Sequence, residues 1–112
     1  IARNYIPKSH PIHAYKEAVK LQGAGLDPTM GPVRLSLAFF MPRPKAITWK
    51  TKPMPAIPHT TIPDADNFAK AVMDALTGLA WGDDAQVCEL HVEKWITAGA
   101  DSPRTEIAID YL

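Results

Sequence analysis

Hydrophobic and polar residues alternate in three stretches of the chain, and a helical spacing occurs in two others. Apolar residues at every second position predict strands over residues 33–41, 85–96 and 105–112. Apolar residues three and four positions apart predict a short amphipathic helix over about 13–22 and a longer one over 66–77. Helices and strands of these lengths, mixed along one short chain, indicate a small domain of the α+β class.

The ends of these elements indicate how they connect. Asp66 is a good N-cap for the longer helix, and Gly78 can adopt the left-handed conformation that ends a helix. The turn at 99–103 can join the last two strands as an antiparallel hairpin. We therefore expect one domain over residues 1–112, with a mainly antiparallel sheet packed against two helices. Ile1 is not a natural first residue, so we also expect N-terminal residues to be missing.

A long proline-rich segment, residues 42–63, interrupts the predicted elements. It holds six of the 11 prolines, which cannot donate backbone hydrogen bonds, so we expect an irregular loop or arm. It also contains Trp49 and four bases but no acid, a composition that suits an arm contacting nucleic acid and equally suits a plain basic linker. The candidate nucleic-acid contacts of the chain are Arg3, Lys8, Arg43, Lys45, Lys50 and Lys52.

Charge is balanced over the whole chain but not along it. The 112 residues contain 12 Lys and Arg and 12 Asp and Glu. Eight bases against two acids give residues 1–50 a net charge of +6, and residues 51–112 carry −6. This asymmetry fits a polyanion-binding surface beside a site that collects cations, although two solvated faces give the same count. Cys88, the single cysteine, excludes an intrachain disulfide, and no apolar run is long enough to span a membrane.

Acidic residues gather near the start of the longer predicted helix. Asp64 and Asp66 lie at this start, and Asp84 reaches the same place if the next strand begins beside it. Converging carboxylates raise one another's pKa unless a cation compensates, and hard oxygen ligands favour Mg²⁺ or Mn²⁺. Lys70, one turn into the helix, is placed to neutralise charge on a phosphodiester. Simpler interpretations are a helix cap, an exposed ion pair of Lys70 with Asp74, and a turn.

Three runs of residues resemble the signature of the RusA-type Holliday junction resolvases, the crossover junction endodeoxyribonucleases. They are Pro63-Asp64-Ala65-Asp66-Asn67 with Lys70, Asp74-Ala75-Leu76-Thr77-Gly78, and Trp81-Gly82-Asp83-Asp84-Ala85-Gln86-Val87. Many positions are specified, so this match is far more specific than a bare pair of aspartates. The chain departs from the family pattern at Ile62, where a basic residue is usual, at Phe68, where leucine is usual, and in its longer proline-rich arm.

The resemblance implies a RusA-like fold and a Holliday junction resolvase that makes paired nicks in four-way DNA junctions as a homodimer. It implies Mg²⁺ as the cofactor, with Mn²⁺ as its substitute, and Asp64, Asp66 and Asp84 as the metal ligands. It also implies structural roles for Asp74 and Asp83, and a cytoplasmic bacterial or prophage-encoded protein that is nucleoid-associated when acting. The catalytic residues that it implies are Asp64, Asp66, Lys70 and Asp84.

Two other functions remain open from the sequence. A non-catalytic DNA-junction-binding accessory protein would use the basic arm, while the acids merely cap a helix and solvate the surface. A different metal-dependent phosphodiesterase would act on RNA or small nucleotides. The geometric question that separates these functions is whether Asp64, Asp66 and Asp84 lie within metal-binding distance of one another.

Overall fold

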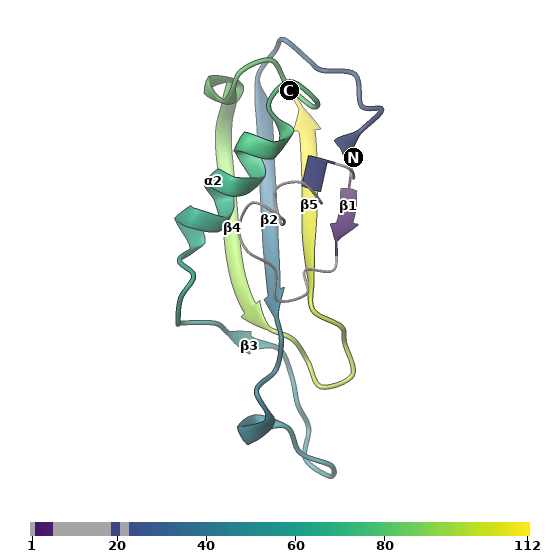
Figure 1. Ribbon diagram of the computed structural model, residues 1–112, viewed down its shortest axis with the longest axis vertical. Helices are drawn as coiled ribbons and strands as arrows, with labels where there is room; N and C mark the ends of the chain where they lie inside the picture. Colours follow the sequence, from purple (N-terminus) through teal and green to yellow (C-terminus); the bar gives the residue numbers. More distant parts are fainter. Residues whose placement is uncertain (1, 6–18, 21–22) are drawn as a thin grey trace.

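The computed structural model describes residues 2–5, 19–20 and 23–112, and its centre is a five-stranded mixed sheet (Figure 1). The strands lie in the order β1-β5-β2-β4-β3. β2 and β4 are parallel, and the other three neighbouring pairs are antiparallel, which confirms a mainly antiparallel sheet. The strands are β1 (Ala2–Tyr5), β2 (Val33–Met41), β3 (Ile57–Pro58), β4 (Val87–Ile96) and β5 (Arg104–Tyr111).

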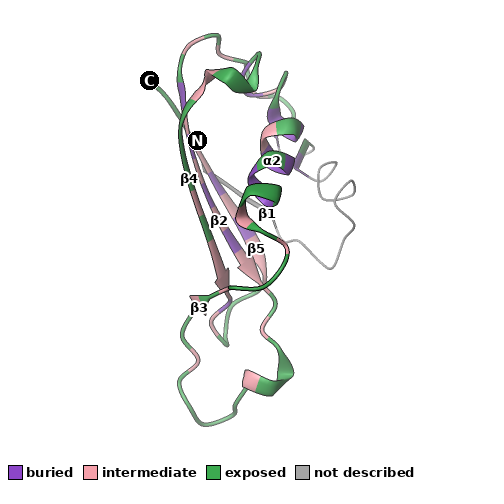
Figure 2. Ribbon diagram, turned by 90° about the vertical axis from the view of Figure 1, so that its left-hand side faces the viewer, coloured by how far each residue is buried: buried purple, intermediate pink, exposed green. Residues whose placement is uncertain are grey.

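One face of the sheet is covered by the helix α2 (Ala65–Leu76), as Figure 2 shows. The helix buries Phe68 and Val72 in the core, and the Phe68 ring stacks on Phe39 of β2 with 4.6 Å between ring centroids. Such stacked pairs add to the stabilisation that burial alone provides. The first predicted helix, about 13–22, lies largely outside the described residues, and its described part, Val19 and Lys20, is helical.

The central strand β2 supplies much of the core. The strand predicted over 33–41 is confirmed at both ends. Val33, Leu35, Leu37 and Phe39 are each at most 2% exposed and lie beneath α2. Because β2 is hydrogen-bonded to β4 on one side and β5 on the other, it occupies the interior of the sheet, which suits the most regular apolar alternation in the sequence.

The predicted hairpin between the last two strands is wrong. β4 and β5 are not neighbours, because β2 lies between them, parallel to β4 and antiparallel to β5. The connection therefore passes beneath the end of β2, where the Thr97 amide donates to the Met41 carbonyl over 3.0 Å. Strands two places apart in a sheet are separated by about 9.6 Å, a span that this connection covers easily. β2 is more apolar than β4 and β5, so placing it at the centre buries the most apolar surface.

The start of α2 differs from the sequence expectation by two residues. Its N-cap is Asp64, and Asp66 lies in the first turn rather than capping the helix. Beginning at Asp64 lets the Phe68 amide donate to the Asp64 carbonyl over 3.2 Å, which adds a hydrogen-bonded turn that a start at Asp66 would lose. The other end is as predicted, because Gly78 follows the C-cap with a φ of 89°.

The proline-rich segment 42–63 is mostly irregular, as expected. It contains a short 3₁₀ turn, η1 (Lys45–Ile47), and the two residues of β3, which pair with the end of β4. The strand predicted over 85–96 begins slightly later, because η2 (Asp84–Gln86) forms another 3₁₀ turn before β4. None of the helices in the described ranges combines the length and the apolar character needed to cross a membrane.

Candidate metal and DNA site

Two exposed carboxylates lie at the beginning of α2. An N-cap aspartate usually accepts a hydrogen bond from an amide of the first turn, but the Asp64 side chain makes no such cap bond. Its carboxylate therefore contributes little to the helix and keeps its oxygens available for a ligand. The Asp66 Oδ1 accepts only from the adjacent Asn67 amide, over 3.0 Å, and this side chain is also exposed. The first turn of α2 thus offers hard oxygen ligands to solvent.

Lys70 follows Asp66 one helical turn later and is exposed. Residues four apart on a helix lie on the same side, so the Lys70 ammonium and the Asp66 carboxylate share one surface of α2. Within the described ranges, the Lys70 side chain has no hydrogen bond or ion pair. Lys70 is therefore free to meet an anionic group that approaches the start of the helix.

The residues of the Trp81–Val87 run have different structural roles. Trp81 is fully buried, and its indole N–H donates to the Thr77 hydroxyl over 3.1 Å. Asp83 caps η2 by accepting from the Ala85 amide over 2.9 Å, which confirms the structural role expected for it. Gln86 accepts from the amides of the turn before η2, and its own amide group donates to the carbonyls of Thr29 and Gly31.

Asp84 is the acidic residue of this run to which the fold gives no side-chain role. Its carboxylate is exposed, and it makes no hydrogen bond or ion pair in the part of the chain that the structure describes. Its neighbours are used for capping and for tying two turns together. An exposed carboxylate with no partner among the described residues, set within a tightly bonded turn, is a candidate for binding a ligand.

Asp84 lies toward the opposite end of α2 from Asp64 and Asp66. Pro63, which precedes Asp64, is hydrogen-bonded to Lys94 near the end of β4, whereas Asp84 precedes the beginning of that strand. At about 3.3 Å per residue, the intervening part of β4 spans roughly 23 Å. Figure 1 shows the same arrangement, with α2 and β4 running in opposite directions. The expected return of a third carboxylate to the start of α2 does not occur within one chain.

No group of three metal-ligating side chains forms in a single copy of the described residues. Nowhere in these ranges do three His, Cys, Asp or Glu side chains lie close enough together to hold a metal ion. Two exposed carboxylates at the start of α2 can still hold Mg²⁺, because Mg²⁺ keeps several water ligands and is commonly bound by one or two carboxylates together with substrate phosphates. The pair Asp64 and Asp66 therefore fits a magnesium ion.

Lys94 holds the segment that leads into α2. Its ammonium donates to the carbonyls of Thr61 and Pro63, both over 2.7 Å. Lys94 occupies an apolar-face position of β4, opposite Phe39 of β2, so its stem lies beside the core while its head reaches the loop. Beside it, burial and the Lys94 charge hold the pKa of His59 below its ordinary value. The sequence signal for this contact was a lysine on the apolar face of an alternating strand.

Replacing this lysine tests its positioning role. Lys94→Met keeps the aliphatic stem and removes both hydrogen bonds, so we expect a loss of about 1–2 kcal/mol in unfolding free energy, measured by urea denaturation. Lys70→Met is the matched control, because Lys70 is exposed and should change stability by less than about 0.5 kcal/mol. Equal losses in the two variants would show that Lys94 does not hold the loop.

The arm bases are not equivalent. The Arg43 guanidinium donates to the carbonyls of Ile47, Pro55 and Thr97, so it binds the arm to itself and to the end of the sheet. Lysines 45, 50 and 52 are exposed and have no acidic partner among the described residues. Of the other predicted contacts, Arg3 lies in β1 and its side chain is not described, and Lys8 lies outside the described residues.

The sheet face opposite α2 is acidic and carries a shallow hollow that the sequence did not predict. The hollow has a volume of about 200 Å³, and Ser36, Ala38 and Ala108 form its floor between Glu93 and Glu106. These carboxylates repel phosphate, and the described side chains of this face include more acids than bases. This face is therefore unfavourable for a phosphate backbone.

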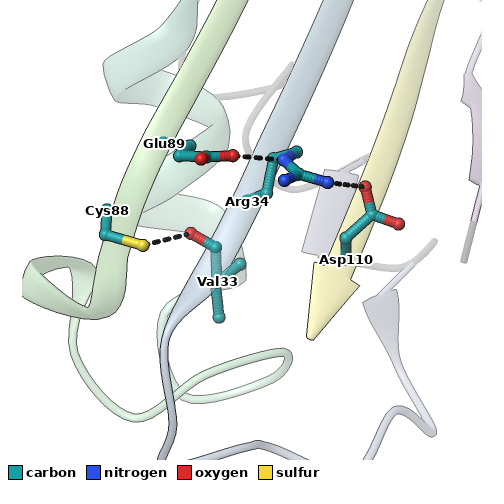
Figure 3. A network of polar contacts seen from close by, with 5 residues as sticks. All are labelled: Val33, Arg34, Cys88, Glu89 and Asp110. Atoms are coloured by element: carbon teal, nitrogen blue, oxygen red, sulfur yellow. Dashed lines mark hydrogen bonds and ion pairs between the residues drawn. The ribbon is translucent and has the colours of Figure 1, made fainter. Parts of the chain in front are cut away.

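Arg34, near the start of this face, is already paired. Figure 3 shows Arg34 between Glu89 and Asp110. Arg34 donates to Glu89, and its Nη1 lies 3.7 Å from Oδ2 of Asp110. The hydrogen bond from Arg34 and its charge hold the pKa of Glu89 below the usual value for a glutamate. Cys88, the extra residue at an irregularity in the β2–β4 register, donates its thiol to the Val33 carbonyl. Arg34 therefore balances acids within the sheet and offers no free charge to DNA.

The structure defines a small α+β domain with two exposed carboxylates at the start of its helix, and comparison with known proteins identifies its family. The sequence profile of the family described as "Endodeoxyribonuclease RusA" matches residues 2–110. The chain therefore belongs to the RusA family of endodeoxyribonucleases, as its sequence motifs indicated. Members of this family act on branched DNA and depend on a divalent metal ion.

A curated bacterial protein is also similar to the chain. It is the "Uncharacterized protein YqaN" of Bacillus subtilis (strain 168), which is 36% identical over 84 residues. The aligned part covers 70% of this chain and 57% of the relative. The chain thus spans a little over half of the relative's length.

Proposed function

We propose that the chain is a Mg²⁺-dependent endonuclease that resolves four-way DNA junctions by paired nicks as a homodimer. The observation that carries this proposal is the pair of uncommitted carboxylates, Asp64 and Asp66, at the start of α2 in a member of an endodeoxyribonuclease family. A purely structural N-cap would use its carboxylate to accept a first-turn amide, and Asp64 does not. Mn²⁺ is expected to substitute for Mg²⁺ because both take oxygen ligands.

Each side chain of the proposed site has a defined task. Asp64 and Asp66 would hold Mg²⁺ and leave positions for water and a phosphate oxygen. The bound ion supplies an activated water and stabilises charge on the phosphate. Lys70 would bind the phosphate that is cleaved and offset its developing negative charge. Lys94 holds the backbone that leads to Asp64 through its bonds to Thr61 and Pro63.

We infer that Asp84 acts in the site of the second copy in the dimer. Within one chain it lies far from Asp64, yet its carboxylate is exposed and its neighbours in η2 are fixed. A twofold dimer that packs two copies with their strands in opposite directions brings the beginning of one β4 near the end of the other. Two such composite sites, related by symmetry, fit a reaction that nicks two strands.

A junction cleavage assay tests the proposed function. The chain is incubated with a labelled four-way junction, or with a linear duplex of the same sequence, in Mg²⁺, Mn²⁺ or EDTA. We expect paired nicks in the junction with either metal, no cleavage in EDTA, and no cleavage of the duplex. Cleavage in EDTA, or a duplex cut as fast as the junction, would contradict the proposal.

A non-catalytic junction-binding protein is the second candidate. The observation that favours it is the separation of Asp84 from the α2 carboxylates within one chain. This candidate predicts tight junction binding that weakens steeply with salt, as expected for lysine contacts to phosphate. It also predicts no metal-stimulated cleavage, so the same assay separates the two functions.

A further inference from the structure

We propose that Trp49, at the exposed side of the arm, is a stacking site for an unpaired nucleobase at the branch of the DNA junction. The arm meant here is residues 43–56, the part of the proline-rich segment 42–63 that contains Trp49. The lysines of this arm would contact the neighbouring phosphates. This inference rests on the proposed function for its substrate, four-way DNA. It goes beyond that function by assigning the arm a ligand and by assigning its aromatic residue a role.

Hydrogen bonds hold the arm in a defined conformation. Arg43 ties its two sides together by donating to the Ile47 and Pro55 carbonyls over 2.7 Å and 3.1 Å. The Gly99 amide donates to the Met54 carbonyl over 2.8 Å, so the far side of the arm is fixed to the β4–β5 connection. A side chain at Gly99 would overlap Met54, which explains a glycine there. The arm can therefore present a side chain in a fixed direction.

Trp49 is held in place and still open to solvent. Its amide donates to the Met54 sulfur over 3.1 Å, and its side chain is 39% exposed. The Arg43 guanidinium carbon lies 5.4 Å from the ring centroid and the Lys52 ammonium 5.5 Å from it. A large aromatic ring bordered by cations is the combination that binds a nucleobase by stacking and its phosphate by charge.

The charge around Trp49 selects DNA as the occupant. The Lys52 ammonium lies over the ring, Lys50 follows Trp49 in the chain, and Lys45 belongs to the same arm. The whole segment 42–63 contains no acid. An apolar peptide would leave these ammonium groups without partners, whereas a nucleic-acid strand supplies a phosphate for each base that stacks. The acidic open face of the sheet, by contrast, excludes the strand from the other side of the molecule.

The position of the arm matches the proposed site. Figures 1 and 2 show the arm projecting beyond the end of the sheet where β3 pairs with β4. That end is also where Lys94 holds Thr61 and Pro63, just before Asp64. A strand that reaches the start of α2 thus lies within the reach of the arm. Bases at a junction branch can leave their stack at a lower cost than bases within a duplex, so a stacking residue favours the branched substrate.

Binding measured in EDTA tests the inference without any cleavage. We would compare Trp49→Leu, which keeps apolar bulk, with Trp49→Phe, which keeps a ring, on a four-way junction and on a linear duplex of the same sequence. Trp49→Leu is expected to weaken junction binding by about tenfold, the scale of one base–aromatic stack, and to change duplex binding by less than about twofold. Trp49→Phe should stay within about threefold of the parent on both DNAs.

The control is Trp95→Leu, because Trp95 lies in β4 and not in the arm, and it should leave the preference for the junction unchanged. Thermal unfolding of each variant accompanies the binding measurements. An equal loss on junction and duplex, or a Trp49→Phe variant as weak as Trp49→Leu, would overturn the stacking role. A ring-dependent junction preference without metal-dependent cleavage would support the inference and contradict the proposed nuclease. Metal-dependent cleavage, together with a Trp49→Leu variant that binds like the parent, would support the proposed nuclease and contradict the stacking role.

Discussion

Asp66→Asn is expected to lower metal-dependent junction cleavage by at least about a hundredfold while leaving junction binding intact. The substitution keeps the size of the side chain and can still accept from the Asn67 amide, so α2 should form normally. It removes one of the two negative charges proposed to hold Mg²⁺. Binding should be equal or slightly stronger, because a carboxylate near phosphate is lost. Single-turnover cleavage of a labelled junction measures the cleavage rate, and binding in EDTA measures the affinity.

Asp101→Asn is the matched control for this experiment. Asp101 is an exposed aspartate in the connection between β4 and β5, and it has no part in the proposed site. Its variant should cleave like the parent. If Asp66→Asn also cleaves like the parent, the start of α2 is not the metal site, and the proposed mechanism fails at its first step.

Trp81→Ala is expected to have the largest effect on stability, about 3–5 kcal/mol in unfolding free energy. Trp81 is fully buried in the core, and its indole N–H donates to the Thr77 hydroxyl at the end of α2. The substitution therefore opens a large cavity and removes a buried hydrogen bond. Since domains of this size are stable by about 5–15 kcal/mol, the variant should be largely unfolded at moderate temperature.

Trp95→Ala provides the comparison, because Trp95 is only half-buried and lies in β4 at the edge of the open face. We expect it to lose less than about 1–2 kcal/mol in urea denaturation. Similar losses in the two variants would show that the Trp81 position is not the core anchor of the fold.

The strands and the long helix were predictable because their patterns are local. The alternation over 33–41 gave β2 at both ends, and the spacing of apolar residues gave α2 to within two residues. The order of strands was not local. Both a β4–β5 hairpin and a crossover place the same residues on the same faces, and only the competition among strands for the central position decides between them. The insertion of β2 between β4 and β5 therefore had no signal in either strand alone.

The sequence predicted which residues belong to the candidate site but not how they lie relative to one another. Asp64, Asp66, Lys70 and Asp84 stand in one short run, but the run folds as a helix and a returning strand that point in opposite directions. Asp84 is therefore near Asp64 and Asp66 in the sequence but far from them in the folded chain. The role of Lys94 was also hidden, because its partners are backbone carbonyls, which any residue at 61 and 63 would supply.

Arg43 shows why a basic residue in an arm is not always a phosphate contact. Its charge made it a candidate, yet its guanidinium is engaged by three carbonyls of the protein. Proline at 44, 53 and 55 removes amide donors from this segment, so the backbone carbonyls need a donor from elsewhere. An arginine inside a proline-rich arm meets that need, and the lysines beside it remain the proposed DNA contacts.

Mixing two inactive variants tests the central claim, that each nuclease site is shared between two copies of the chain. Asp66→Asn and Asp84→Asn are purified separately, combined under conditions that exchange subunits, and assayed on a labelled junction with Mg²⁺. In a mixed dimer with shared sites, one site carries both substitutions and the other carries none. We therefore predict that each variant alone is inactive and that the mixture nicks one strand of the junction. A mixture as inactive as the separate variants would contradict the shared site, because sites within one chain would each keep one substitution.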